Sequence, residues 1–248
     1  MGTFLTAEWR SLAMLNYRID PSLLADLVPA GTELDTFAGE HYVSVVGFMF
    51  LKTKVRGVPI PLHRNFEELN LRFYVRRKEA DGWRRGVVFV RELVPRFAIA
   101  WVARTFYNEN YISLPMRHQV AGVNTAYQFK HAGRWNTLSV RTAGAPSFAA
   151  PGSVEEFITE HYWGYARQRD GGTLAYEVQH PPWKIFPVAE SAFDCDKAFY
   201  GAQFTETLSA APASAFLADG SAITVKSGIR LAEMRGGLRS AALSNGSA

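Results

Sequence analysis

The chain has 248 residues, of which 48% are hydrophobic, 13% aromatic and 20% charged. These fractions are typical of a globular protein with ample core material, and they exclude a disordered tail, a fibre and a repeat array. The formal net charge is +4, and the basic residues are 20 arginines but only 7 lysines. Arginine is preferred over lysine for planar, bidentate contacts with carboxylates or phosphates, so this excess directs attention to anionic partners.

The chain carries no sequence signal for secretion or membrane insertion. Cys195 is the single cysteine, which excludes an internal disulfide or a zinc cluster of cysteines. The first ten residues lack a basic start followed by an apolar stretch, so no signal peptide is expected. The longest apolar run, residues 42–51, is far shorter than the ~20 residues of a membrane span. We therefore expect a soluble cytoplasmic protein with no membrane partner.

The first predicted elements are a helix and a long strand. Asp20 is suited to cap a helix, Pro21 to occupy its first position, and the following leucines to form an apolar face that ends before Pro29. Residues 42–51 are rich in β-branched and aromatic side chains and predict a largely buried strand.

Most of the remaining pattern is typical of antiparallel strands. Residues 69–75 alternate between apolar and polar, and residues 86–92 are their expected partner across a turn at 80–82. Helices are predicted at 95–107 and after the capping box 153–156. Further strands are predicted at 126–130, 135–141, 174–179, 185–191 and 222–225.

The pattern favours a single α+β domain dominated by antiparallel sheet. Residues 142–152 are rich in Ala, Pro and Gly, but strand-like patterns flank them on both sides, so they are not interpreted as a linker. We expect one domain over residues 1–230, followed by a flexible polar tail over residues 231–248.

Motifs for cofactors, metals and nucleic acids are missing from the sequence. It contains no phosphate loop, no GxGxxG and no GxSxG, and its six histidines have no metal-ligand spacing. No cofactor and no metal are therefore expected. One hairpin end is strongly basic and is interpreted as a solvated face rather than a phosphate-binding patch, so no nucleic-acid partner is expected. Its residues are Arg72, Arg76, Arg77, Lys78, Arg84 and Arg85.

Three polar residues occupy one face of a strand that is otherwise expected to be buried. Glu68, Asn70 and Arg72 are spaced by two and therefore share a face. One interpretation is an ion pair of Glu68 with Arg72 at the sheet surface, worth ~0–1 kcal/mol. The other is a carboxylate held near arginines in the mouth of a barrel, where it orients a ligand or moves a proton.

Two further stretches contribute candidate site residues. Arg18 ends a predicted strand just before the first helix. Arg104 follows the apolar run 99–103 and is expected to be half-buried, paired with a carboxylate of a glutamate or of a ligand. Tyr111 and His118 are candidate acid/base groups, although a single histidine is more often structural.

These stretches resemble a known family. Residues 17–21, Phe66–Glu67–Glu68 and residues 103–111 resemble signature motifs of the acetoacetate decarboxylase family. The closer similarity is to the bacterial DUF2071 family (YqjF-like proteins) of the same superfamily, and it extends over residues 5–230. The segments that carry it are 43–48, 68–75, 85–89, 180–183 and 214–220.

The resemblance implies a closed or nearly closed antiparallel β-barrel-like fold with a few peripheral helices and a polar pocket. In the decarboxylases, that pocket holds a Schiff-base lysine whose pKa a second lysine lowers. When the motifs are aligned on Arg104, the two lysine positions are Tyr111 and Ile112. A Schiff-base decarboxylase is therefore not expected, whereas Arg18 and Glu68 match the pocket arginine and glutamate of the family.

Three hypotheses about function remain open. The first is a protein that binds a small anionic or carbonyl-bearing metabolite, such as a keto acid, without chemistry. The second is an enzyme of lyase, isomerase or hydrolase type, with Glu68 as general base and Arg18 stabilising a developing enolate. The third is an interaction module, and a homo-oligomer is compatible with all three. The candidate ligand-binding residues are Arg18, Arg72, Arg104, Tyr111 and His118.

Overall fold

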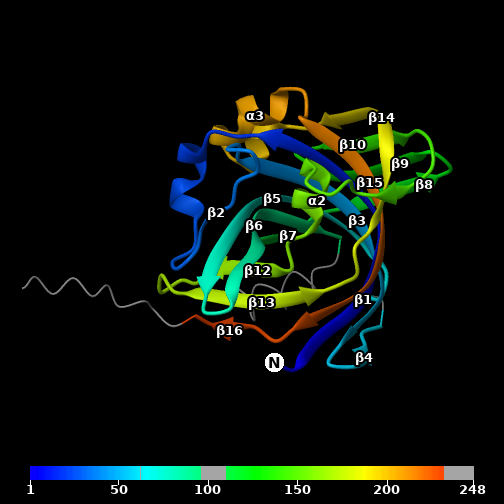
Figure 1. Cartoon of the computed structure of the whole chain (residues 1–248). Coiled ribbons are helices and arrows are strands. Elements are labelled where there is room, and N and C mark those ends of the chain that lie inside the picture. Colours follow the sequence, from blue (N-terminus) through cyan, green and yellow to red (C-terminus); the bar gives the residue numbers. More distant parts are fainter. Residues whose placement is uncertain (62, 96–109, 232–248) are drawn as a thin grey trace, which may run out of the picture.

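The fold is a closed barrel of seven strands with further strands outside it (Figure 1). The computed structural model describes residues 1–61, 63–95 and 110–231. Within this part of the chain, the ring order is β13-β12-β6-β5-β3-β1-β15, and pairing of β13 with β15 closes it. The barrel strands are β1 (Thr3–Arg18), β3 (Tyr42–Val55), β5 (Phe66–Glu79), β6 (Gly82–Val94), β12 (Trp163–Arg167), β13 (Thr173–Gln179) and β15 (Ser214–Lys226).

Further strands and a few short helices lie outside the barrel. Strands β8, β9, β10 and β14 continue from β15 as an outer sheet. The strands outside the ring are β2 (Glu33–Leu34), β4 (Val58–Pro59), β7 (Tyr111–Ser113), β8 (Met116–Ala121), β9 (Asn124–His131), β10 (Arg134–Thr142), β11 (Ser147–Phe148), β14 (Lys184–Asp194) and β16 (Ile229–Arg230). The described helices are η1 (Pro21–Leu27), α2 (Val154–Thr159), η2 (Lys197–Tyr200), η3 (Ala202–Phe204) and α3 (Thr205–Ser209). None of the helices in the described ranges is long and apolar enough to cross a membrane.

The predicted elements are confirmed where the structure describes them. All the predicted strands lie within observed strands, and β5 and β6 form the expected antiparallel hairpin. The helix capped by Asp20 is a 3-10 helix, in which the Asp20 carboxylate accepts a hydrogen bond of 2.9 Å from the Ser22 amide. Ser153 caps α2 as expected. The helix predicted at 95–107 falls mostly, and the tail from 232 entirely, outside the described residues.

Both faces of β5 are buried, for different reasons. Phe66 and Tyr74 belong to the core inside the barrel, and the polar residues between them share their face. The alternate residues Leu69, Leu71 and Phe73 pack outside the barrel against the outer sheet. Because a strand directs successive side chains to opposite faces, one strand supplies both the cavity wall and the interface between the two layers.

A glycine allows the outer sheet to lie directly on the barrel. Gly47 in β3 faces the ring of Tyr127 in β9, and a Cβ atom at position 47 would lie 2.7 Å from Cδ2 of that ring. The Tyr127 hydroxyl also donates a hydrogen bond of 2.8 Å to the Ser11 carbonyl in β1. Any side chain at position 47 would therefore force the two layers apart.

Candidate functional site

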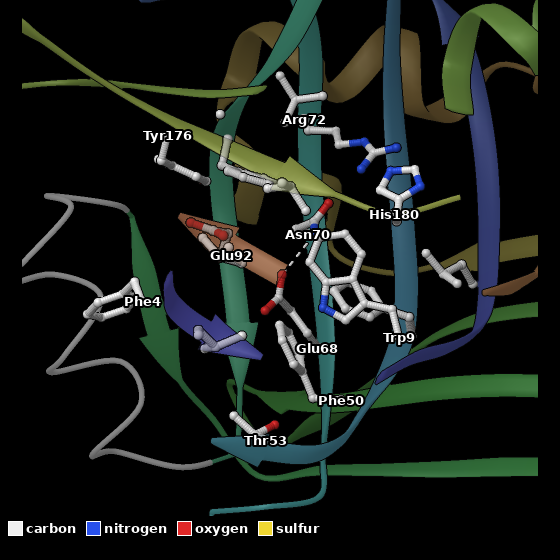
Figure 2. Close-up of a pocket in the computed structure, with 18 of the residues that line it drawn as sticks. Phe4, Trp9, Phe50, Thr53, Glu68, Asn70, Arg72, Glu92, Tyr176 and His180 are labelled. Carbon is white, nitrogen blue, oxygen red and sulfur yellow. Dashed lines mark hydrogen bonds between the residues drawn. The ribbon is translucent and has the colours of Figure 1, made fainter. Parts of the chain in front are cut away.

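A cavity of about 170 Å³ is lined by strands from around the barrel (Figure 2). Most of its wall is aromatic or aliphatic, and the polar residues converge largely from β5, β6 and the segments that precede β12 and β14. The polar lining residues are Thr53, His63, Glu68, Asn70, Arg72, Glu92, Tyr111, Thr159, His161 and His180.

Glu68 is a buried carboxyl on the cavity wall. It is only 2% exposed, and its carboxylate accepts hydrogen bonds from the Asn70 amide at 3.0 Å and from the Tyr111 hydroxyl at 3.1 Å. Burial raises the pKa of Glu68 to about 7, even though both hydrogen bonds and the charge of Arg72 act to lower it. A carboxyl with this pKa exchanges a proton readily near neutral pH, as a general acid or base must.

Arg72 lines the same cavity and forms no ion pair within 4.0 Å among the described residues. Its side chain lies 4.0 Å from the Met14 sulfur, and the guanidinium carbon is 5.7 Å from the centre of the Tyr74 ring. Its Nε atom is buried and has no hydrogen-bond partner in the described ranges. The ion pair of Arg72 with Glu68 considered from the sequence does not form in the described part of the chain. Burying a cation without a paired anion is costly.

A buried Asp–His pair, which the sequence analysis missed, also reaches the cavity. The Asp35 carboxylate lies 3.1 Å from Nε2 of His161 and accepts a hydrogen bond of 2.7 Å from Arg85. Burial lowers the pKa of His161 to about 4, so its ring is neutral at pH 7 and Nε2–H donates to Asp35. Burial alone would raise the pKa of Asp35, but the hydrogen bonds from His161 and Arg85 bring it down to about 2. Nδ1 of His161 has no hydrogen-bond partner in the part of the chain that the structure describes.

Two of the expected site residues do not line the cavity. Arg18 is exposed at the last position of β1, because the strand ends there and its side chain projects into solvent. His118 lies on the outer sheet, where its Nδ1 is 2.6 Å from the Glu67 carboxylate. Since Glu67 and Glu68 are consecutive in β5, their side chains lie on opposite faces, and His118 is therefore across the barrel wall from Glu68. The expectation that Arg18 and His118 join this pocket is not met.

The positions aligned with the decarboxylase lysines lie on opposite faces of a short strand. Tyr111 in β7 lines the cavity, whereas Ile112 packs against the outer core. All seven lysines are among the described residues and none lines the cavity. Lys184 is exposed, with its ammonium 5.8 Å from the centre of the Phe148 ring. Arg104 lies outside the described residues.

The barrel is similar to solved structures of acetoacetate decarboxylase-like proteins. The acetoacetate decarboxylase of Legionella pneumophila superposes with a TM-score of 0.68 at 13% identity, covering 94% of this chain and 89% of that one. The enduracididine biosynthesis enzyme MppR, complexed with pyruvate, gives 0.67 at 13% identity, covering 94% and 92%. An acetoacetate decarboxylase-like enzyme from Sphingomonas wittichii RW1 gives 0.64 at 11% identity, covering 94% and 95%. The chain therefore has the acetoacetate decarboxylase-like fold.

Sequence comparison identifies the family within that fold. The model of the family DUF2071, described as an uncharacterized conserved protein, matches residues 6–222. The uncharacterized protein YqjF of Bacillus subtilis (strain 168) is 32% identical over 182 residues, which are 71% of this chain and 73% of that protein. The chain belongs to the DUF2071 family of YqjF-like proteins, and the resemblance seen in its motifs is confirmed.

Proposed function

We propose that the protein binds a small anionic carbonyl metabolite, of the keto acid type, in the barrel cavity. Arg72 carries this proposal, because it is a buried arginine on the cavity wall that forms no ion pair within the described residues, and its charge acts on Glu68 only without direct contact. A ligand carboxylate would supply the missing negative charge and accept two parallel hydrogen bonds from the guanidinium.

Other polar atoms around the cavity add to the argument. Oγ1 of Thr53, Nε1 of Trp9 and Oδ1 of Asn70 are buried without hydrogen-bond partners among the residues that the structure describes, and all three residues line the cavity. Buried polar groups in folded proteins are nearly always satisfied, so a polar ligand or ordered water is expected next to them. The fold neighbour MppR was solved with pyruvate, which makes keto acids the first probes to test.

Thermal unfolding in the presence of keto acids tests the proposal. Pyruvate, acetoacetate and 2-oxoglutarate are titrated against the wild type, Arg72→Met and the control Arg18→Met, whose position is exposed outside the cavity. We expect at least one keto acid to raise Tm of the wild type and of Arg18→Met in a concentration-dependent way, and to leave Arg72→Met unchanged. Equal stabilisation of Arg72→Met, or no stabilisation by any of the three, would contradict the proposal.

A second candidate function is catalysis with Glu68 as general base. The observation that favours it is a buried carboxyl with a pKa of about 7, on the same cavity wall as Arg72. The carboxylate would take a proton from the carbon beside the ligand carbonyl, and the electron pair of the broken C–H bond would form an enolate. The positive charge of Arg72 would stabilise that enolate.

Hydrogen exchange into pyruvate separates this enzyme from a binding protein. In D₂O, the wild type should replace the methyl protons of pyruvate with deuterium faster than buffer does, as followed by proton NMR. Glu68→Gln should lose this acceleration and still be stabilised by pyruvate. If the wild type and Glu68→Gln exchange at the same rate, Glu68 is not the base and the binding function alone remains.

A further inference from the structure

One side of the cavity is built from aromatic rings. The ring of Trp9 lies 5.2 Å from that of Phe48 and 6.3 Å from that of Trp183, measured between centres. Phe50 and Phe66 are stacked at 4.7 Å beside them. All five residues line the cavity, and none is needed to bind a carboxylate. The cavity therefore has an apolar part that the proposed function does not use.

The strand register separates the aromatic and polar parts along the barrel. Across β1, β3 and β5, one row of paired residues is Trp9, Phe50 and Phe66. The rows further along the strands become polar. In the next row, Phe48 of β3 is paired with Glu68 of β5. The two rows after it are Met14, Val46 and Asn70, and then Asn16, Ser44 and Arg72. A ligand that lies along the strands thus passes from aromatic to charged surroundings, with Glu68 between them.

The Arg72 side chain brings its positive charge closer to the aromatic part of the cavity. Its contact with the Met14 sulfur shows that the guanidinium extends back from its own row toward the aromatic one. His180, whose pKa is lowered by burial and also by the charge of Arg72, stacks on Trp183 at 4.1 Å. Figure 2 shows the Arg72 side chain directed toward His180. The cation and the aromatic wall therefore meet at His180.

We infer that the ligand is an amphipathic monocarboxylate with an aryl ring or an apolar group of similar size. Its carboxylate would bind Arg72 while its ring packs against Trp9, Phe48 and Trp183. The inference rests on the proposed function, because it takes Arg72 as the anion site. The cavity has room for an aryl ring, since an apolar cavity of roughly 150 Å³ holds benzene and this cavity measures about 170 Å³. Pyruvate alone would leave the aromatic part unfilled.

Calorimetric titration of the whole protein with phenylpyruvate and pyruvate tests the inference. Both carry the same keto acid group, so only the ring differs. We expect phenylpyruvate to bind about 10-fold to 100-fold more tightly, as burial of a phenyl group predicts. Trp9→Leu should weaken phenylpyruvate several-fold and leave pyruvate unchanged. The control Trp83→Leu, at a position 45% exposed and outside the cavity, should change neither affinity.

The outcomes separate this inference from the proposed function. If the two ligands bind with equal affinity and Arg72→Met binds neither, the inference of an aryl ligand is wrong but the proposed carboxylate site stands. Binding of neither ligand would overturn both. Tighter binding of phenylpyruvate that Trp9→Leu does not weaken would also overturn the inference. If Trp9→Leu fails to fold, Trp9→Phe keeps a ring at this position and should give a smaller loss in the same direction.

Discussion

The Tyr111 hydroxyl donates a hydrogen bond of 3.1 Å to the Glu68 carboxylate and so joins β7 to β5 at the cavity wall. The motif resemblance aligns Tyr111 with one of the two positions where the acetoacetate decarboxylase family has lysine. A phenol cannot form an imine with a keto acid, but it can hold a carboxylate and tune its pKa. The site is therefore suited to anion binding and proton transfer rather than to Schiff-base chemistry.

Glu68→Gln should change how the stability of the protein depends on pH. The pKa of Glu68 is about 7 in the folded protein against an ordinary 4.5, so the folded state binds more protons between these values and the free energy of unfolding falls as pH rises. Above about pH 7 the buried Glu68 carboxyl is ionised, and the full free-energy cost of that charge lowers the stability of the folded protein. Glutamine stays neutral, so Glu68→Gln should match the wild type near pH 4.5 and exceed its stability near pH 8 by up to about 3 kcal/mol.

Urea unfolding of both proteins across this pH range measures the effect. The pH dependence that comes from every other group is shared and cancels in the difference between them. A difference that stays constant from pH 4.5 to pH 8 would mean that Glu68 ionises in the folded protein as it does in the unfolded chain.

Tyr111→Phe should raise the pKa of Glu68 still further. The substitution removes a hydrogen bond that stabilises the ionised carboxylate, so the protonated carboxyl becomes relatively more stable. The loss of the hydrogen bond should also lower the free energy of unfolding by about 1 kcal/mol. Carbon NMR of the labelled Glu68 carboxyl reports the pKa directly. Tyr127→Phe is the matched control, because it loses a tyrosine hydrogen bond outside the cavity and should leave the titration of Glu68 unchanged. An unaltered pKa in Tyr111→Phe would contradict the assigned contact.

His161 should contribute to acid destabilisation. Its pKa is about 4 in the folded protein against an ordinary 6.5, so the unfolded chain binds the extra proton as pH falls through this window. Stability is complete above about pH 6.5 and declines toward pH 4. His161→Gln can still donate a hydrogen bond to Asp35 but does not titrate. It should therefore lose up to about 3 kcal/mol less stability than the wild type between pH 6.5 and pH 4. His131→Gln on β9 is the control that should keep it. If the stability of His161→Gln falls between pH 6.5 and pH 4 as steeply as that of the wild type, the His161 ring is protonated in the folded protein and the prediction is wrong.

Gly47→Ala should destabilise the protein by about 1–3 kcal/mol, because the added methyl group overlaps the Tyr127 ring between the two layers. Denaturant unfolding measures the loss. Tyr127→Leu removes the ring that the methyl group meets, so Gly47→Ala should cost less in that background than in the wild type. If Gly47→Ala lowers the free energy of unfolding equally in the wild type and in Tyr127→Leu, the overlap with the Tyr127 ring is not the cause of the destabilisation.

The strand pattern predicts most of this fold because its signals are local. The alternation from Glu68 to Phe73 identifies both faces of β5, and the family motifs supply the closure of the barrel, which alternation alone does not contain. The pattern also places Glu68 and Arg72 on one face of β5 but leaves open whether that face meets water or lines a cavity, and the structure buries both residues.

Contacts between distant segments were harder to predict. Asp35 and His161 are 126 residues apart and share no spacing motif, so only the folded barrel brings them together. His118 lies outside the cavity because its strand belongs to the outer sheet, and nothing local in the sequence distinguishes a strand that covers a barrel from one that forms it. The motif that contains Arg18 does not specify where the strand ends relative to the cavity.

The central claim is that Arg72 binds the carboxylate of a ligand inside the barrel. A crystal structure of the protein with phenylpyruvate tests it most directly. We expect the carboxylate within hydrogen-bond distance of the Arg72 guanidinium, at about 2.7–2.9 Å, with the ring against Trp9. A ligand bound elsewhere on the protein, or a carboxylate in the cavity turned away from Arg72, would contradict the account.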